Sequence, residues 1–266
     1  MTLNVLLSAM NLKDLSIIDQ LNIKSDAVVI NQCDREADEV FEDDGKKVRF
    51  ISRNEKGLSK SRNLAVNAAW GDICLYCDND VKYSEDYENA VKSAFERHPD
   101  ADIIVFFIKR KERLSPVYKK ESRLGYLKSM KIFSPEIAFR RESVIKAGLM
   151  MDEDFGAGAK YSMGEENIFL FEAKQKGLKV WYVPYRLATL IETESTWFKG
   201  YTEEFFRNRG AGYYRMTKSG YFFLCLQFAI RKRALYSPDG ISFLSAMKFM
   251  MAGKSEYVEY KNIHSR

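Results

Sequence analysis

The chain has 266 residues, 46% of them apolar and 14% aromatic, so it can bury the core of one large α/β domain or of one domain with an appendage. This composition excludes a disordered chain and a collagen-like fibre. The formal net charge is +5, but it is unevenly placed: residues 199–266 hold 12 Lys and Arg against 5 Asp and Glu, so residues 1–198 sum to −2.

A basic tail on a near-neutral body predicts an anionic surface as a partner. A membrane with acidic lipids fits better than nucleic acid, because helix-turn-helix, RNP-like and zinc-finger signatures are absent. The first residues lack the basic segment and the cleavage site of a signal peptide. The longest apolar stretch, residues 221–230, is half as long as the ~20 residues of a membrane span. We therefore expect a cytoplasmic protein that is at most peripheral at the inner face of the plasma membrane.

The first part of the chain alternates short apolar strands with helical segments. Strands are expected at 4–8, 27–30, 48–52, 73–77 and 101–108, and helices at 12–21, 59–69 and 84–97. This alternation predicts a mostly parallel sheet with helices on both faces. Ligands of such sheets bind beyond the carboxyl ends of the strands, where Ser8, Asn31, Arg53 and Asp78 lie.

The later part is less regular. Residues 109–120 are basic and predict a loop, either a solvated connector or a loop that faces an acceptor or a membrane. We expect a strand at 133–140, a short helix at 142–146, a glycine-rich loop at 155–159, a helix that ends at Gly177, a strand at 179–183, and helices at 203–216, 221–235 and 240–251. The predicted organisation is one α/β domain over residues 1–198 with a helical extension, residues 199–266, packed on it.

Two carboxylates, Asp78 and Asp80, follow the buried strand at 73–77. Carboxylates at the end of a buried strand are costly unless a positive group lies there, and the usual group is a hard divalent cation that carries phosphates. For an isolated tripeptide, the alternative is a turn whose acids cap a helix.

The segment around these acids resembles the family-2 glycosyltransferases of the GT-A fold. That family carries a glycine, a Ser- or Ala-Arg-Asn helix, a Gly-Asp strand and an Asp-x-Asp motif, which here are Gly57, Ser61-Arg62-Asn63, Gly71-Asp72 and Asp78-x-Asp80. The resemblance implies a Rossmann-like GT-A catalytic domain over residues 1–198. It also implies inverting transfer of a sugar from a nucleotide-diphosphate donor to a hydroxyl of a glycan or lipid-linked glycan, in the synthesis of a bacterial surface polysaccharide such as a capsule.

The resemblance also implies a cation, Mn²⁺ or Mg²⁺. Asp80 would ligate it directly, and Asp78 would contact the ribose or reach the metal through water. Many relatives place a histidine after the strand that ends near Pro184, and this chain has none there. Glu192 or Glu194 would supply an oxygen ligand instead, or water and the diphosphate would complete the shell.

For the nucleotide, the resemblance places a base-reading acid after the second strand. This chain has Asn31 and Gln32 there, and an amide can still hydrogen-bond uracil, so a UDP-sugar is the expected donor. Ser8 lies at the end of the first strand, and Gly57 lets the backbone approach the nucleotide closely. Arg62 would lie near the base or the diphosphate; the alternative is a surface charge on its helix.

The run Gly164-Glu165-Glu166-Asn167-Ile168-Phe169 resembles the family's Gly-Glu-Asp-x-x-Phe motif, whose third residue is the catalytic base. The resemblance implies that Glu166 deprotonates the acceptor hydroxyl and that Glu165 binds acceptor hydroxyls. The alternative is that both acids only stabilise the first turn of a helix.

Two other functions are open. A sugar nucleotidyltransferase would show a glycine-rich, basic loop after the first strand, and residues 8–12 contain no glycine. A non-catalytic nucleotide- or sugar-binding protein would need no base at position 166. The aromatic and basic tail is either helix packing with solvated charges or a lid and surface for a lipid diphosphate acceptor. The run 222–230, followed by Arg231-Lys232-Arg233, also fits an interfacial helix.

Overall fold

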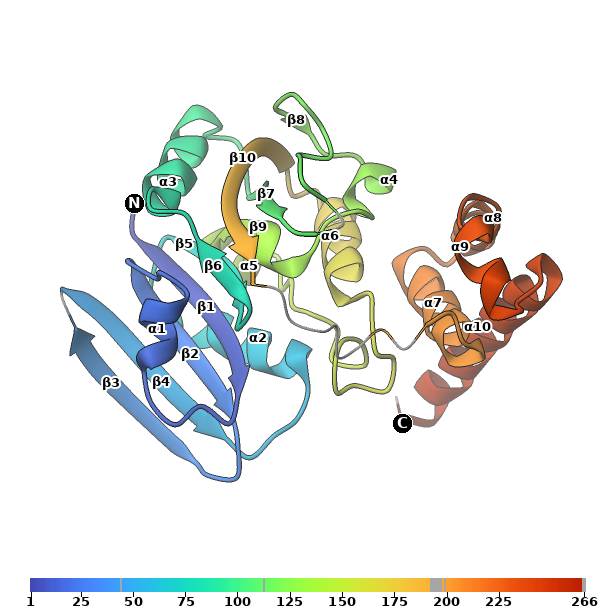
Figure 1. The fold of residues 1–266 in the computed structure, drawn as a ribbon, viewed down its shortest axis with the longest axis horizontal. Coiled ribbons are helices and arrows are strands. Elements are labelled where there is room, and N and C mark those ends of the chain that lie inside the picture. Colours follow the sequence, from blue (N-terminus) through green and yellow to red (C-terminus); the bar gives the residue numbers. More distant parts are fainter. Residues whose placement is uncertain (44, 112, 192–197, 199, 265–266) are drawn as a thin grey trace.

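The computed structural model describes residues 1–43, 45–111, 113–191, 198 and 200–264 (Figure 1). The strands are β1 (Leu3–Met10), β2 (Asp26–Gln32), β3 (Ala37–Asp43), β4 (Lys46–Arg53), β5 (Ile73–Asp78), β6 (Val81–Tyr83), β7 (Ile103–Lys109), β8 (Ser122–Arg123), β9 (Ile137–Arg140) and β10 (Val180–Leu190). The helices are α1 (Ser16–Gln20), α2 (Leu58–Ala68), α3 (Tyr87–Arg97), α4 (Tyr126–Ser129), α5 (Arg141–Lys146), α6 (Glu165–Gln175), α7 (Glu203–Met216), α8 (Tyr221–Arg231), α9 (Arg233–Tyr236) and α10 (Phe243–His264), with 3₁₀ turns at Ser134–Glu136 and Ser237–Asp239.

The strands form one sheet in the order β3-β4-β2-β1-β5-β9-β7-β10-β6, and β8 pairs with β10. Its centre is parallel: β4, β2, β1 and β5 run the same way, so their carboxyl ends meet at one edge. The register places Ser8 of β1 beside Asp78 of β5. The predicted α/β fold with a mostly parallel central sheet is therefore confirmed, and β9 is an antiparallel insertion between β5 and β7.

Helices cover both faces of the sheet, because the inner strands are apolar on both sides. One face buries Ile17 of α1 and Tyr87, Val91 and Phe95 of α3. The other face buries side chains of α2, α5 and α6, among them Val66 and Phe169. The strand-end edge is thus held between two separate cores.

Several elements differ from the sequence-based expectations: β6, β8 and α4 were not expected, and the helix expected at 221–235 is divided into α8 and α9. Three further differences concern β3, β10 and α10. Strand β3 was not expected, because Ala-Asp-Glu-Val-Phe-Glu-Asp is mostly acidic. It forms an edge strand that pairs antiparallel with β4, where the register sets Glu42 opposite Lys47. Strand β10 continues beyond Pro184 with shifts in register, as an irregular strand allows. Helix α10 is 22 residues long and runs on to His264, because its later turns pack on α7.

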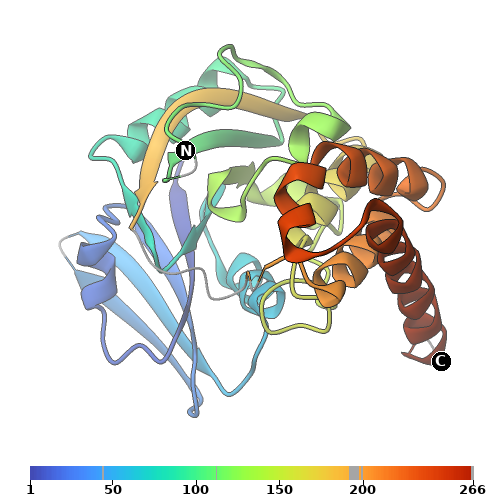
Figure 2. The same cartoon turned by 45° about the vertical axis from the view of Figure 1, so that its right-hand side comes forward.

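The four helices α7 to α10 share a third core with the glycine-rich loop and α6, through Phe155, Tyr161, Ile168 and Phe171. Figure 2 shows α10, in dark red, on the outer side of this region. Helices α7 and α10 cross in very close contact: a Cβ at Gly210 would lie 1.9 Å from the Met250 carbonyl oxygen, and one at Gly253 would lie 2.0 Å from that of Arg207. Only glycine fits at this crossing.

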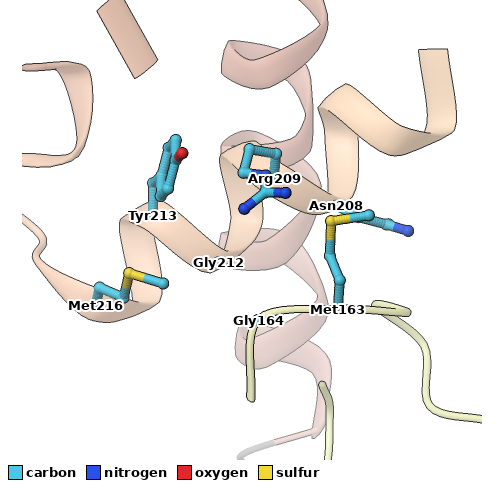
Figure 3. A pocket seen from close by; sticks show the side chains of 7 residues that line it. All are labelled: Met163, Gly164, Asn208, Arg209, Gly212, Tyr213 and Met216. Carbon is cyan, nitrogen blue, oxygen red and sulfur yellow. The ribbon is translucent and has the colours of Figure 1, made fainter. Parts of the chain in front are cut away.

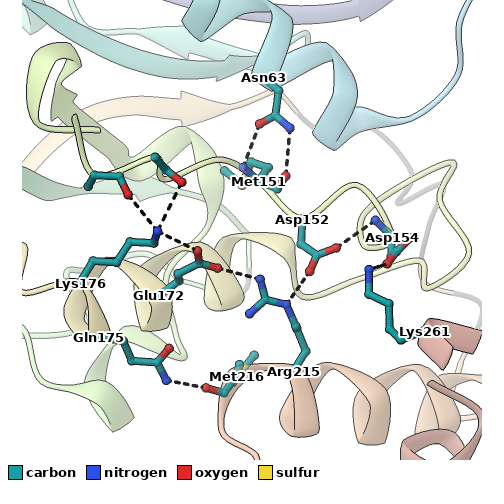
Figure 4. Close-up of polar contacts among 12 residues, drawn as sticks. Asn63, Met151, Asp152, Asp154, Glu172, Gln175, Lys176, Arg215, Met216 and Lys261 are labelled. Atoms are coloured by element: carbon teal, nitrogen blue, oxygen red, sulfur yellow. Dashed lines mark hydrogen bonds and ion pairs between the residues drawn. The ribbon is translucent and has the colours of Figure 1, made fainter. Parts of the chain in front are cut away.

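Ion pairs also join these helices to the α/β part (Figure 4). Arg215 of α7 donates from Nε to Asp152 at 2.6 Å and from Nη2 to Glu172 of α6 at 2.7 Å. Lys261 of α10 lies 2.5 Å from Asp154. Hence the loop before α6 is held by α7 and α10, and the division into a domain and an extension stays a prediction. The proposed boundary at residues 198 and 199 adjoins positions outside the described residues.

Within the described part of the chain, we find no helix that is both long and apolar enough to cross a membrane.

Candidate active site

Arg62 of α2 connects three distant parts of the chain. Its guanidinium donates from Nη2 to Asp78 Oδ1 at 2.8 Å and from Nη1 to Glu165 Oε1 at 3.0 Å, and its side chain is only 1% exposed. Burial alone would lower the pKa of Arg62, but the charges of Asp78 and Glu165 raise it above its usual value. A buried cation paired with two carboxylates fixes the end of β5 against the start of α6.

The candidate base, Glu166, lies in the first turn of α6, next to Glu165. Burial, and then the charge of Glu165, raise the pKa of Glu166 to about 8, while the charges of Arg62 and Arg209 act in the opposite direction. A carboxyl group with a raised pKa is a stronger base once it is deprotonated. Its environment therefore fits proton abstraction from an acceptor hydroxyl.

The glycine-rich loop packs on the start of α2 and lies next to Glu165. Leu58 N donates to Ala157 O at 2.9 Å, and Ser59 Oγ donates to Phe155 O at 2.6 Å. Gly156 has φ +104°, and a Cβ there would lie 3.1 Å from Ser59 Oγ and 3.2 Å from Glu165 Cδ. This loop therefore needs a glycine at position 156 to reach Glu165.

The predicted nucleotide residues lie along the strand-end edge. Ser8 accepts a hydrogen bond from Ser61 Oγ at 2.8 Å, beside Asp78. Gln32 Nε2 donates to Gly57 O at 3.1 Å, and Gly57 has φ +127° at the start of α2. Ser8, Gln32 and Asp78 thus contact α2 or its N-cap Gly57, and Arg62 belongs to α2 itself. The contact of these five residues with a nucleotide stays a prediction.

Asn31 is placed differently from its neighbours. Its Oδ1 accepts from Leu12 N at 2.8 Å and its Nδ2 donates to Leu12 O at 3.1 Å, and the residue is fully buried. The amide therefore holds the loop after β1 in place. This contact gives Asn31 a positioning role at the edge where the nucleotide is expected.

For the cation, the structure offers Asp78, the last residue of β5, and Asp80 in the turn between β5 and β6. Asp78 is 29% exposed while bound to Arg62, and the Asp80 carbonyl accepts from Ile191 N at 2.7 Å. Glu192 and Glu194 lie outside the described residues. Among the residues the structure does describe, no group of three or more His, Cys, Asp or Glu side chains is arranged to hold a metal ion. The two carboxylates fit Mg²⁺ or Mn²⁺ in donor chemistry, and further ligands must come from elsewhere.

Helix α7 approaches the base from the other side. With Met163 and Gly164 it lines a small pocket, to which it contributes Asn208, Arg209, Gly212, Tyr213 and Met216 (Figure 3). The Arg209 guanidinium lies 5.1 Å from the ring centre of Phe205 and 5.0 Å from that of Phe228, and its Nε is buried without a hydrogen-bond partner. Arg209 is thus a cation held near Glu166, in a position that its sequence context did not reveal.

This geometry agrees with the comparison to protein families. The family described as Glycosyl transferase family 2 matches residues 16–156, more than half of the chain. The chain belongs to the family-2 glycosyltransferases. The match includes Arg62, Asp78 and Asp80 but ends before Glu165 and Glu166, so the assignment of these two glutamates depends on the geometry around Arg62.

Solved structures support the GT-A fold. S. aureus TarS 1–349 in complex with UDP matches with a TM-score of 0.64 and 13% identity, over 100% of this chain and 92% of that one. The complex of the same protein with UDP-GlcNAc matches with a TM-score of 0.62 and 13% identity, over 100% of this chain and 93% of that one. Mannosyltransferase PcManGT from Pyrobaculum calidifontis, in complex with GDP-Man and Mn²⁺, matches with a TM-score of 0.51 and 14% identity, over 97% of this chain and 75% of that one. No curated protein matches this sequence.

Proposed function

We propose that this family-2 glycosyltransferase transfers a sugar, with inversion, from a nucleotide-diphosphate donor to a hydroxyl group of a glycan or lipid-linked glycan in surface-polysaccharide synthesis. The observation that carries the proposal is the double ion pair of Arg62, because it joins Asp78 at the end of β5 to Glu165 of α6, the neighbour of Glu166. A UDP-sugar is the proposed donor. The UDP and UDP-GlcNAc complexes of the similar TarS structures support this choice.

In this proposal Glu166 accepts the proton of the acceptor hydroxyl as the oxygen attacks the anomeric carbon and the nucleoside diphosphate leaves. Glu165 accepts a hydrogen bond from Arg62 and keeps the first turn of α6 in position. Arg62 fixes the distance between β5 and α6. The proposed donor site at the end of β5 and the base Glu166 therefore keep one geometry before the acceptor binds.

The leaving diphosphate needs positive charge. Asp78 and Asp80 would hold Mn²⁺ or Mg²⁺, which supplies that charge when bound. A Mn²⁺ complex of the similar mannosyltransferase supports a divalent metal in this fold. Within the chain, Arg62 adds a fixed cation beside Asp78.

On the acceptor side, Arg209 and the small pocket near Gly164 are the residues we propose to face the incoming hydroxyl. The charge of Arg209 stabilises the carboxylate form of Glu166, which is the form that accepts a proton. The acceptor would therefore enter between α6 and α7.

The test is nucleoside diphosphate release from UDP-GlcNAc, UDP-glucose and GDP-mannose, with soluble glycans as acceptors, by the wild type and Glu166→Gln. Removing a general base lowers the rate on the order of a hundredfold or more. UDP binding, measured separately, should be retained. Release by Glu166→Gln at the wild-type rate would overturn the assignment of the base.

A further inference from the structure

Helix α8 is apolar on both sides of its axis, but the fold covers only one of them. The covered side carries Leu224, Cys225 and Ala229, which are buried against α7 and α10. Phe228, on the same side, lies with its ring centre 6.1 Å from that of Phe205. This side accounts for the packing of α8 on the protein.

The opposite side of α8 presents Phe222, Phe223, Leu226 and Ile230, which helical spacing places together. Phe222 is 52% exposed, Phe223 60% and Ile230 60%. A helix at a protein surface normally carries polar residues at such positions. We call these four residues the outer face of α8; Leu235 and Leu244, 52% and 77% exposed, follow it along the chain.

Cations flank this outer face along the chain, in a stretch of sequence without acids. The sequence from residue 205 to 238 contains no Asp or Glu. Lys218 precedes α8 and Arg231, Lys232 and Arg233 end it, all four exposed. Among the described residues, none of these four cations forms an ion pair. An apolar helix face bordered by exposed Lys and Arg is the arrangement of helices that lie in a membrane interface.

We propose that the outer face of α8 docks on an anionic lipid bilayer, with Phe222, Phe223 and Ile230 among the acyl chains and Arg231, Lys232 and Arg233 at the headgroups. A second copy of the chain is a poorer occupant: an isologous contact pairs the same patch with itself and would bring like charges together. Anionic headgroups, in contrast, complement all four cations.

The position of this face also suits the proposed transfer reaction. Phe228 of α8 packs on Arg209 of α7, and Arg209 acts on Glu166. The outer face therefore lies one helix away from the candidate base, so a lipid-linked acceptor in the bilayer would be presented near α7. This last step depends on the proposed function, whereas the docking itself does not.

The experiment measures binding of the full chain to vesicles of phosphatidylcholine, with and without phosphatidylglycerol. We expect strong binding only to the mixed vesicles, and weaker binding at high salt because salt screens the headgroup charge. Arg231→Gln/Lys232→Gln/Arg233→Gln should lower partitioning on the order of a hundredfold, since each cation near an anionic surface contributes roughly fivefold. Phe223→Ser/Ile230→Ser should lower it at least tenfold.

Leu127→Ser is the matched control, because Leu127 is 51% exposed on the short helix α4, outside this face. It should bind vesicles like the wild type. A cooperative thermal melt at the wild-type temperature shows that each variant is folded, and because it needs no nucleotide it separates this test from the proposed function. Equal binding to neutral and mixed vesicles, no binding to either, or a dimer that Phe223→Ser/Ile230→Ser converts to a monomer would each overturn the proposal.

Discussion

Arg62 and Glu165 are 103 positions apart in the chain, yet Arg62 Nη1 donates to Glu165 Oε1 at 3.0 Å in the protein interior. The same guanidinium binds Asp78. Removal of one partner from a buried charge group leaves the others uncompensated, which makes Arg62 the residue on which the geometry of the site depends most.

Arg62→Met should therefore destabilise the fold by about 3–5 kcal/mol, because two carboxylates lose their buried partner. Chemical denaturation measures the change in the free energy of unfolding. Arg123→Met is the control: Arg123 pairs with Asp100 at 2.6 Å, but its side chain is 59% exposed, so its loss should cost less than about 1 kcal/mol. Equal costs for the two variants would show that the Arg62 network does not stabilise the fold.

The raised pKa of Glu166 makes stability depend on pH. Folding raises this pKa from 4.5 to about 8, so the folded protein holds the proton more tightly than the unfolded chain. The resulting stabilisation is complete below pH 4.5 and is lost as the pH rises towards 8. Without added metal, the melting temperature of the wild type should fall relative to that of Glu166→Gln over this range. Glu96→Gln, at an exposed carboxylate of α3, is the control: its melting temperature should differ from that of the wild type by the same amount at each pH. A constant difference between wild type and Glu166→Gln would contradict the raised pKa.

Gly156→Ala tests the closure of the glycine-rich loop. The new Cβ meets Ser59 Oγ and Glu165 Cδ and must adopt φ +104°, which should cost about 1–3 kcal/mol and displace the loop from α2. Thermal melts and UDP affinity report the two effects. Gly125→Ala offers a matched control, because its φ is −78° and a Cβ there has no neighbour within 4 Å. If both variants behave like the wild type, the loop does not support the site as described.

Arg209→Met should slow transfer without weakening the donor complex. Loss of this cation raises the pKa of Glu166 further, and each added unit lowers the deprotonated fraction about tenfold below that pKa. The measurement is kcat beside the dissociation constant for UDP. Arg207→Met, two positions along α7, removes a cation that pairs with Glu203 and Glu256 instead, so it should keep kcat. If Arg209→Met changed only the UDP affinity, Arg209 would belong to the donor site and the proposed acceptor-side role would be wrong.

Much of the fold followed from local pattern. Alternating apolar strands and helices identified the central sheet, and the Asp-x-Asp spacing placed Asp78 at a strand end, because both signals arise from neighbouring residues. The acidic edge strand β3 escaped prediction, since its pairing with Lys46 and Lys47 of β4 offsets a composition that disfavours strands. The length of α10 depends on its contacts with α7, which no local window contains.

The sequence named the candidate site residues, whose roles stay a prediction, but it gave no sign of the contacts between them. Arg62 was expected at the nucleotide, whereas the structure shows it between two carboxylates on separate elements. Asn31 was expected to read a base, and its amide is engaged with the backbone of Leu12. Both relationships join residues that only the tertiary fold brings together, so sequence spacing carries no signal for them.

Calorimetric titration of UDP, with and without Mn²⁺, into the wild type and Asp80→Ala tests the central claim most directly. The account predicts tight binding that requires Mn²⁺ and is lost in Asp80→Ala, because the cation would join the strand-end carboxylates to the diphosphate. GDP, CDP and ADP in the same titration define the base. Absence of binding by every nucleotide, with or without Mn²⁺, would contradict a nucleotide-sugar site at the end of β5.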